Sequence, residues 1–393
     1  MIHRTFLHNT QKNINKRVIY EFNKLKKKIK NKQSPLLEVY SKNYDLNIPY
    51  KKIKKFRKYE NIIIIGMGGS ILGIKSIYSF LSSKIKKNVI FFDNLNEHFI
   101  DQFNNIKNKK KTCFIIISKS GNTLETIINF NLVYKDILKK NFIIITENSN
   151  SILRNFAKEK NLIYIEHREY IGGRFSVLSE VGMTPAYLMG VDIKKFRNLF
   201  TLLEGKKIQN KLIKDVSNIY HFFKKKQRIN VNLVYDSDLK DLVYWYQQLI
   251  SESLGKSKKG IYPTISTNPK DHHSLYQLYL DGPRDKFYTF FASNVKSGNG
   301  IKRKITKNFN LIKNIDLNKI IKSQSEASQS VFKRNKIPFR AFEFKKKNSE
   351  NLGLIFKYFI LEVILLSKIL KVNAFNQPAV ESIKAETKKI LLR

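Results

Sequence analysis

The sequence predicts an α/β protein built on mainly parallel sheets that are flanked by helices. Five short apolar runs in the first half are the main observation, and they are NIIII from residue 61, NVIFF from 88, TCFIII from 112, NFIII from 141 and LIYI from 162. They show no alternation of apolar and polar residues, and the stretches between them are long enough to hold helices. Continuous apolar strands that alternate with helices are typical of a parallel sheet covered on both faces.

A weaker series of apolar runs follows in the second half. Its members are VNLVYD from residue 231, FYTFFAS from 287 and FRAFEF from 339. DLVYWYQQLISESLG reads as a helix that ends at Gly255, and residues 352–370 read as a long core helix. The second half is therefore expected to be another α/β unit, in tandem with the first.

The chain is expected to divide into three consecutive parts. Residues 1–55 read as polar helices with sparse apolar positions, packed against the outside of the body. Residues 56–195 form the first α/β unit, and residues 196–393 form the second unit with a C-terminal helix. No Pro-rich or Ser-rich linker separates the two units, so they should pack closely.

Composition indicates a soluble cytoplasmic protein. The 393 residues are 42% hydrophobic and 12% aromatic, which fits a globular chain of two domains. The single Cys113 excludes a disulfide framework and Cys-rich zinc sites. The first twenty residues lack the apolar centre of a secretory signal, although an organelle transit segment remains open. Lys357, Glu362 and Lys368 interrupt the most apolar long segment, which favours a buried helix over a membrane span.

The formal net charge of +43 permits two interpretations. A basic protein can bind nucleic acid through the phosphate backbone. The lysines are spread along the whole chain, however, and their excess accompanies an excess of Ile, Asn, Phe and Tyr, all specified by A/T-rich codons. Drift in base composition explains all five excesses together. We therefore expect no nucleic-acid partner, and a positive field that attracts an anionic substrate.

A glycine-rich loop, GMGGSILG at residues 66–73, follows the first predicted strand. A strand followed by glycines and a helix start is typical of an anion site, because helix N–H groups point at the ligand. A dehydrogenase is the competing interpretation, since Asp93 ends the second predicted strand where a ribose-binding acid would lie. The dinucleotide fingerprint needs glycine at position 71, where this chain has Ile71.

A hydroxyl-rich loop, SKSGNTLET at residues 118–126, follows the third predicted strand and favours a sugar phosphate. Both loops leave the carboxyl ends of parallel strands, where open α/β sheets bind ligands. Two loops that converge on one small anion suit a sugar phosphate better than a dinucleotide. The alternative is a plain helix cap, with Thr123 or Ser120 capping and Glu125 in the first turn.

Further motifs are more specific. They are YIGGRFSVLSEVGMTPAYLMG at 170–190, QQLISESLGKSKKGIYP, HHSLYQLYLDG and NAFNQPAVESIK. With these motifs in collinear order, residues 60–393 resemble the glucose-6-phosphate isomerase (phosphoglucose isomerase) family. The resemblance implies two tandem sugar-isomerase (SIS) domains, a homodimer with a shared active site, and neither a metal nor an organic cofactor. It also implies a role in glycolysis or gluconeogenesis, with interconversion of glucose 6-phosphate and fructose 6-phosphate.

The resemblance assigns roles to individual residues. Glu252 would shuttle the proton between C2 and C1, and Arg174 would stabilise the enediolate. His273, supplied by the other subunit, and Lys384 would handle ring opening. Other residues would bind the substrate or orient His273, and they are Gly68, Gly69, Ser70, Ser118, Lys119, Ser120, Thr123, Glu125, Gln248 and Gln377.

Some positions depart from the family pattern or leave a choice open. Asn376 and Ala379 stand where the family usually has Asp and Gly, and the methyl group of Ala379 enters a place of tight backbone approach. His272 is an alternative to His273, although the register of the motif favours His273.

The chemistry supports these roles without the family. Removing a proton next to a carbonyl needs a carboxylate base, and a guanidinium suits the developing oxyanion. Each residue also has a plain alternative: Glu252 as a surface carboxylate, Arg174 in an ion pair with Glu169 or Glu180, and Lys384 as a solvated lysine. A non-catalytic sugar-phosphate sensor and a dual phosphoglucose/phosphomannose isomerase are the remaining alternatives for function.

Overall fold

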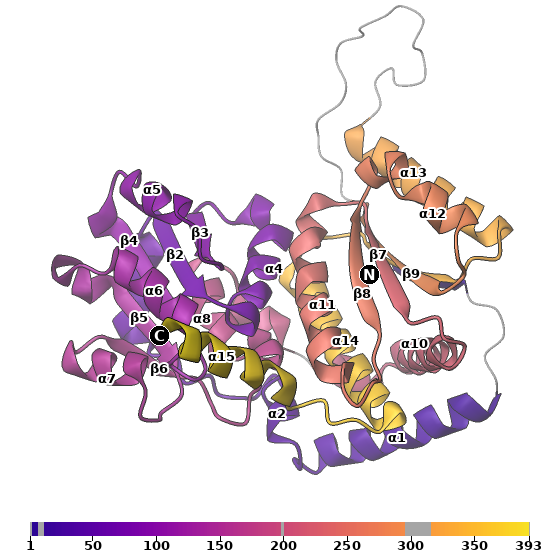
Figure 1. The fold of residues 1–393 in the computed structure, drawn as a ribbon, viewed down its shortest axis with the longest axis horizontal. Coiled ribbons are helices and arrows are strands. Elements are labelled where there is room, and N and C mark those ends of the chain that lie inside the picture. The colour runs from indigo at the N-terminus through magenta and orange to yellow at the C-terminus, as the bar shows by residue number, and fades with distance from the viewer. Residues whose placement is uncertain (1, 7–11, 198–199, 295–315, 393) are drawn as a thin grey trace, which may run out of the picture.

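Two five-stranded sheets organise the chain in the computed structural model. The structure describes residues 2–6, 12–197, 200–294 and 316–392. Figure 1 shows the two sheets side by side, each with helices against its faces. The predicted α/β class with doubly wound, mainly parallel sheets is confirmed.

The first sheet is entirely parallel, in the order β3-β2-β4-β5-β6. Its strands are β2 Asn61–Gly66, β3 Asn88–Phe92, β4 Thr112–Ile117, β5 Phe142–Thr146 and β6 Ile163–Glu166. The five apolar runs therefore all form strands, as predicted.

Both faces of the first sheet are buried. Ile62 and Ile64 belong to one hydrophobic core, and Ile63 and Ile65 belong to another. Successive side chains of a strand point to opposite faces, so a sheet with two covered faces needs apolar residues at every position. The helices on these faces are α4 Leu72–Phe80, α5 His98–Asn104, α6 Leu124–Val133, α7 Ile152–Glu159 and α8 Glu180–Leu188.

The second sheet has the order β1-β10-β9-β7-β8, with β1 antiparallel to β10 and the other pairs parallel. Its strands are β1 Ile2–Phe6, β7 Ile229–Val234, β8 Tyr262–Thr267, β9 Lys286–Ser293 and β10 Phe339–Phe344. The three predicted strands are confirmed. The expectation that residues 1–55 are helical is wrong for Ile2–Phe6, which pairs with the edge of the second sheet. The division into parts at residue 195/196 stays a prediction.

Helices cover both faces of the second sheet (Figure 1). α12 and α13 pack on one face, and α10, α11 and α14 pack on the other. The helices outside the first sheet are α1 Lys12–Lys30, α2 Pro35–Glu38, α3 Tyr50–Ile53, α9 Phe200–Glu204, α10 Lys206–Lys224, α11 Lys240–Leu254, α12 Tyr276–Asp281, α13 Leu317–Arg334, α14 Ser349–Leu370 and α15 Glu381–Leu391. No helix in the described parts of the chain is long and apolar enough to cross a membrane.

The two halves join where α4 lies against α11 (Figure 1). The Ser79 hydroxyl donates to the Asp241 carboxylate across this junction. Phe80 packs edge-on against Phe344, with ring centroids 5.1 Å apart. These contacts fix α11, whose last turn contains Glu252, relative to the first sheet.

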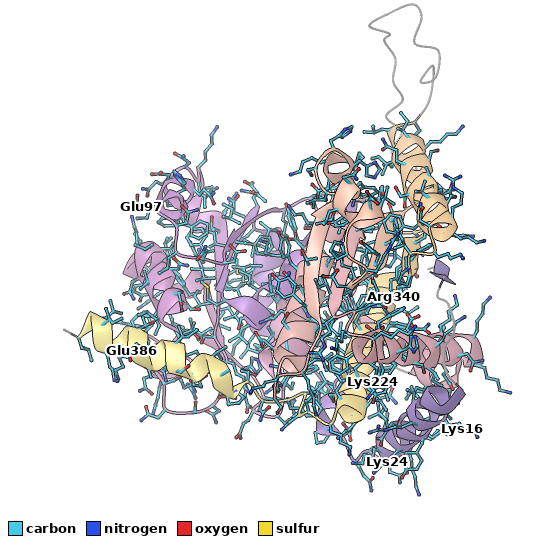
Figure 2. The ribbon with its side chains drawn as sticks, turned by 45° about the vertical axis from the view of Figure 1, so that its right-hand side comes forward. Lys16, Lys24, Glu97, Lys224, Arg340 and Glu386 are labelled. Carbon is cyan, nitrogen blue, oxygen red and sulfur yellow. The ribbon has the colours of Figure 1, made fainter. Side chains whose placement is uncertain are left out.

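Lysines gather on the outer helices α1 and α10, which lie against each other. Figure 2 shows Lys16 and Lys24 of α1 and Lys224 of α10 at one corner of the molecule. Lys16 and Lys24 are exposed, so water solvates both of these charges.

A buried ion cluster around Arg340 links the second sheet to its helices (Figure 2). The Arg340 guanidinium lies 2.9 Å from Asp215 of α10 and also pairs with Glu362 of α14. It donates to the Tyr246 hydroxyl at 2.7 Å, and the Tyr358 hydroxyl donates to Asp215 at 3.0 Å. Because both carboxylates are fully buried, the Arg340 guanidinium supports both charges, and the nearby Lys211 also acts on Asp215.

We expect Arg340→Met to lower the free energy of unfolding by about 3–5 kcal/mol, because it removes the guanidinium that pairs with two buried carboxylates. Tyr358→Phe, which removes one hydrogen bond to a charged group, should cost about 1.5–3 kcal/mol. Lys322→Met is the control, since it breaks a partly exposed i,i+4 pair with Glu326 and should cost less than about 0.5 kcal/mol. Urea unfolding measures all three, and equal losses in Arg340→Met and Lys322→Met would contradict the expectation.

Lys357 is a second buried charge, on α14. Its side chain is 2% exposed, and its ammonium donates to the Phe196 carbonyl at 2.7 Å. Burial, together with the nearby Arg197, lowers the pKa of Lys357 from 10.5 to about 7. Between these two pH values the unfolded chain binds more protons than the folded one, so stability rises with pH across this window. Below about pH 7 the cost of burying the charge is fully present.

We expect Lys357→Met to raise the free energy of unfolding at pH 6 by on the order of a few kcal/mol. It should also flatten the rise in stability between pH 7 and pH 10. Lys368→Met, at an exposed position of the same helix, is the matched control and should leave that rise intact. Denaturant unfolding across the pH range measures both, and a wild-type slope in Lys357→Met would contradict the expectation.

Candidate functional site

The two predicted anion loops leave the same edge of the first sheet. β2 and β4 are neighbours, and Gly66 pairs with Ile117 at their carboxyl ends. The chain passes from β2 to β3 on one side and then to β4 on the other. This reversal of strand order is the topological switch point at which open α/β sheets bind ligands. The prediction that the two loops lie together is confirmed.

The glycine loop is in contact with the other parts of the site. Gly68 has φ +51°, and a Cβ there would lie 2.7 Å from Nε2 of Gln248. A Cβ on Gly69 would lie 2.2 Å from the carbonyl carbon of Gly173. Side chains at positions 68 and 69 would therefore push the glycine loop away from α11 and from the turn before Arg174. Ser70 is buried in the turn at Gly68–Ser70.

The hydroxyl-rich loop is held together by its own side chains. The Ser118 and Thr123 hydroxyls are 2.8 Å apart, and the Gly121 N–H donates to Ser118 Oγ at 3.1 Å. Thr123 is the N-cap residue of α6 but makes no side-chain capping bond. The exposed Ser120 Oγ accepts from the Asn122 N–H at 3.3 Å. The loop is therefore not a plain helix cap, and the N-terminus of α6 suits an anion.

Lys119 and Glu125 are the two charged residues of this loop. The Lys119 ammonium donates to the Glu169 carbonyl at 2.9 Å and lies 3.4 Å from the Glu147 carboxylate. Glu125 is half-buried in the first turn of α6. Lys119 thus brings a cation to the edge where the phosphate is expected.

Arg174 is deeply buried in the site, with a side chain that is 1% exposed. Each of its five N–H donors has one acceptor. The acceptors are Ser253 Oγ (2.8 Å), Glu252 Oε2 (3.0 Å), Gln377 Oε1 (2.5 Å), the Asn376 carbonyl (3.2 Å) and the Ala374 carbonyl. Burial lowers the pKa of Arg174, while the Glu252 carboxylate acts in the opposite direction. The guanidinium is therefore fixed in position before any substrate arrives.

Glu252 is the partly exposed partner of Arg174. It lies in the last turn of α11, and 31% of its side chain is exposed. Its other oxygen accepts from the Gln248 amide at 2.7 Å, one helical turn earlier. The alternative pairing of Arg174 with Glu180 is wrong, because Glu180 lies 3.4 Å from Arg168. The structure thus brings together Arg174, Glu252, Gln248 and Gln377.

Two contributors to the site were missed in the sequence. Ser253 is fully buried and accepts from Arg174 Nε. Lys256 was not among the predicted site residues. Burial and the nearby Arg174 lower the pKa of Lys256 to about 8, and Glu252 acts in the opposite direction. Both residues lie in the SESLGK motif, which was the available signal, but a motif does not show which way a side chain points.

Two predicted residues lie apart from this group. His273 is exposed, in the turn at Lys270–His273 after β8. Its neighbour His272 is instead within the fold, 2.7 Å from the Tyr235 hydroxyl. Lys384 forms an exposed pair with Glu381, 2.8 Å away, on α15. Over the described ranges, no hydrogen bond or ion pair connects His273 or Lys384 to Glu252 or Arg174.

The structure disfavours a dinucleotide site at this edge. Asp93, the candidate ribose-binding acid, lies 2.6 Å from the Lys75 ammonium. Ile71 is buried just before α4, where the fingerprint requires glycine. Within the part of the chain that the structure describes, no three His, Cys, Asp or Glu side chains are grouped to hold a metal ion.

Comparisons with known sequences agree with this geometry. The family model described as phosphoglucose isomerase matches residues 4–392. Glucose-6-phosphate isomerase of Methanocaldococcus jannaschii is 34% identical over 378 residues, which cover 89% of this chain and 87% of that protein. Glucose-6-phosphate isomerase of Mycoplasmopsis pulmonis is 33% identical over 361 residues, with coverage of 84% and 83%.

Solved structures have the same fold. A hypothetical protein of Thermus thermophilus superposes with a TM-score of 0.76 at 22% identity, over 96% of this chain and 94% of that one. A glucose-6-phosphate isomerase of Chlamydia trachomatis gives a TM-score of 0.72 at 18% identity, over 91% and 72%. At these identities the structures show the fold alone, while the sequence matches show the family. The chain belongs to the phosphoglucose isomerase family.

Proposed function

We propose that this chain interconverts glucose 6-phosphate and fructose 6-phosphate. The observation that supports it most is the contact between Glu252 and Arg174, 3.0 Å apart, next to the two loops at the carboxyl edge of the first sheet. A base and a fixed cation are the two groups that proton transfer next to a carbonyl requires. The family match over residues 4–392 supports the same reaction.

The phosphate binds at the hydroxyl-rich loop. Ser118, Ser120 and Thr123 supply hydroxyls, the first turn of α6 supplies backbone N–H groups, and Lys119 supplies positive charge. The phosphate does not react. Its binding energy instead holds the sugar carbons against Glu252.

Glu252 transfers the proton in this scheme. In the open-chain aldose it takes the proton from C2, and the electron pair moves toward the C1 carbonyl oxygen. The resulting enediolate is stabilised by the Arg174 guanidinium, which stays charged and already has its final position. The proton then goes to C1, the proton of the C2 hydroxyl moves to the C1 oxygen, and the carbonyl forms at C2, so no atom is gained or lost.

Ring opening involves His273 and Lys384 in this proposal, in a cytoplasmic homodimer. His273 is exposed, and in the described structure it makes no hydrogen bond or ion pair with Glu252 or Arg174 of its own chain. This position suits a histidine that contributes to the active site of a second copy. α15 contains no buried residue, so packing within the chain does not hold Lys384 at its position. Both figures show α15 along the outside of the half that contains the first sheet.

We expect Glu252→Gln to lower kcat by about 10² or more, because the amide cannot accept the C2 proton. Gln is nearly isosteric and still offers an oxygen to Arg174, so folding should be unchanged. Glu97→Gln is the matched control, at an exposed site just before α5. Conversion of fructose 6-phosphate, coupled to a glucose-6-phosphate dehydrogenase, measures the rate.

The outcomes separate the alternatives. Full activity in Glu252→Gln would remove Glu252 from its role as the base. A wild-type protein that binds the sugar phosphates but converts none would favour the sensor. Mannose 6-phosphate in the same assay distinguishes the dual isomerase from a glucose-specific one.

We expect Gly69→Ala to lower kcat/KM by roughly tenfold or more, because displacement of the turn at Gly173 moves Arg174. Gly190→Ala is the control. A Cβ at Gly190 would meet nothing within 4 Å, although its φ of +87° is strained for alanine. It should therefore lose stability but keep its activity. Steady-state kinetics with thermal unfolding of both variants measures this, and equal kinetic losses would contradict it.

A further inference from the structure

The loop that follows the catalytic helix α11 contacts the segment that follows α14. The Lys256 ammonium donates to the Asn373 carbonyl at 2.5 Å and to the Ser253 carbonyl at 3.1 Å. The Lys259 ammonium donates to the Leu370 carbonyl at 3.0 Å. Two cations of one loop thus bind backbone carbonyls at both ends of the stretch 370–373.

The residues just beyond this stretch hold Arg174. Three of the five acceptors of its guanidinium are the Ala374 carbonyl, the Asn376 carbonyl and the Gln377 amide oxygen. Phe375 also packs against Phe175, with ring centroids 5.6 Å apart. We call residues 370–377 the anchor segment.

The chain beyond the anchor segment has no comparable support. Residues 378–392 are all exposed, and α15 has no buried residue. Gln377 itself is exposed, although its amide oxygen lies 2.5 Å from Arg174. The position of the anchor segment therefore depends on the contacts at 370–377 and on nothing downstream among the described residues.

We propose that Lys256 and Lys259 are positioning residues of the isomerase, whose ammonium groups fasten the anchor segment to the end of α11 so that Arg174 stays aligned with Glu252. The proposal rests on the isomerase function proposed above. The loop GKSKKG contains three lysines, and the proposal gives a reason for two of them, Lys256 and Lys259. The third, Lys258, is exposed and contacts no carbonyl of the anchor segment in the described structure.

The charge of Lys256 follows from its surroundings. The charged groups that face it are Arg174 and Glu252, and burial together with Arg174 lowers the pKa of Lys256 to about 8. The ammonium is thus present below pH 8 and is lost above it. A charged donor makes a stronger hydrogen bond to a carbonyl than a neutral amine does. We therefore expect turnover to decline above about pH 8 as the anchor segment loosens.

The test compares Lys256→Met, Lys259→Met and Lys256→Arg with Lys258→Met as the matched control in the same loop. We expect kcat to fall by roughly tenfold in Lys256→Met, with KM within about threefold, because misalignment of Arg174 affects the transition state most. Lys259→Met should lose less, and Lys258→Met should match the wild type. Lys256→Arg should keep most of its turnover and lose the decline above pH 8, since arginine stays charged.

A second measurement does not depend on activity. Hydrogen exchange of backbone amides, followed by mass spectrometry, should be faster for residues 371–377 in Lys256→Met and unchanged in Lys258→Met. A purely helix-capping role for Lys256 would lower thermal stability without changing exchange in this segment or the pH profile, and that result would overturn the proposal. Wild-type turnover in Lys256→Met, or equal losses in Lys256→Met and Lys258→Met, would overturn it too.

The two proposals fail separately. If the wild type shows no isomerase activity, the proposed function fails, while hydrogen exchange still reports whether the lysines fasten the anchor segment. If the wild type is active and the exchange of residues 371–377 is the same in Lys256→Met, the positioning role fails and the isomerase function stands.

Discussion

The buried guanidinium of Arg174 is the constraint on which the site depends. A cation with 1% exposure is costly unless each of its donors finds an acceptor. The acceptors come from the end of α11 and from the segment after α14, two places that are more than a hundred residues apart in the chain. Gly69 and Gly173 meet without side chains and bring the glycine loop to the same point. The contacts that satisfy the Arg174 charge therefore bring the base, the cation and an anion loop to one place.

The rest of the site follows from the topology of the first sheet, and this part was predictable. Strands buried on both faces must be apolar throughout, so the central strands β2, β4 and β5 stand out in the sequence. β8 was missed because it is an edge strand: it contains Pro263, and most of its residues are only partly buried or exposed. β1 was missed for a related reason, since the five residues IHRTF form no apolar run, and their pairing partner β10 lies more than three hundred residues away.

Motifs identified the residues of the site better than they identified its contacts. Glu252, Arg174, Gln248 and Gln377 were expected, and the structure joins them. That Ser253 and two backbone carbonyls complete the shell of Arg174 depends on how α11 and the anchor segment meet, which no local pattern encodes. The places where His273 and Lys384 act could not be predicted, for a different reason. Neither side chain is held by the interior of its own chain, so the packing of a single chain does not determine where they act.

The unequal exposure of Glu252 and Arg174 matches the different demands on a base and on an electrostatic stabiliser. A stabiliser is most effective when it needs no reorganisation during the reaction, and Arg174 has five contacts that keep it in place. A base must instead exchange partners, because it approaches C2 and then C1. Glu252 is 31% exposed, and among the described residues its carboxylate is bound by two side chains, Gln248 and Arg174, which can yield to substrate. Four of the five contacts of Arg174 do not involve Glu252, so the cation keeps its place while the carboxylate moves.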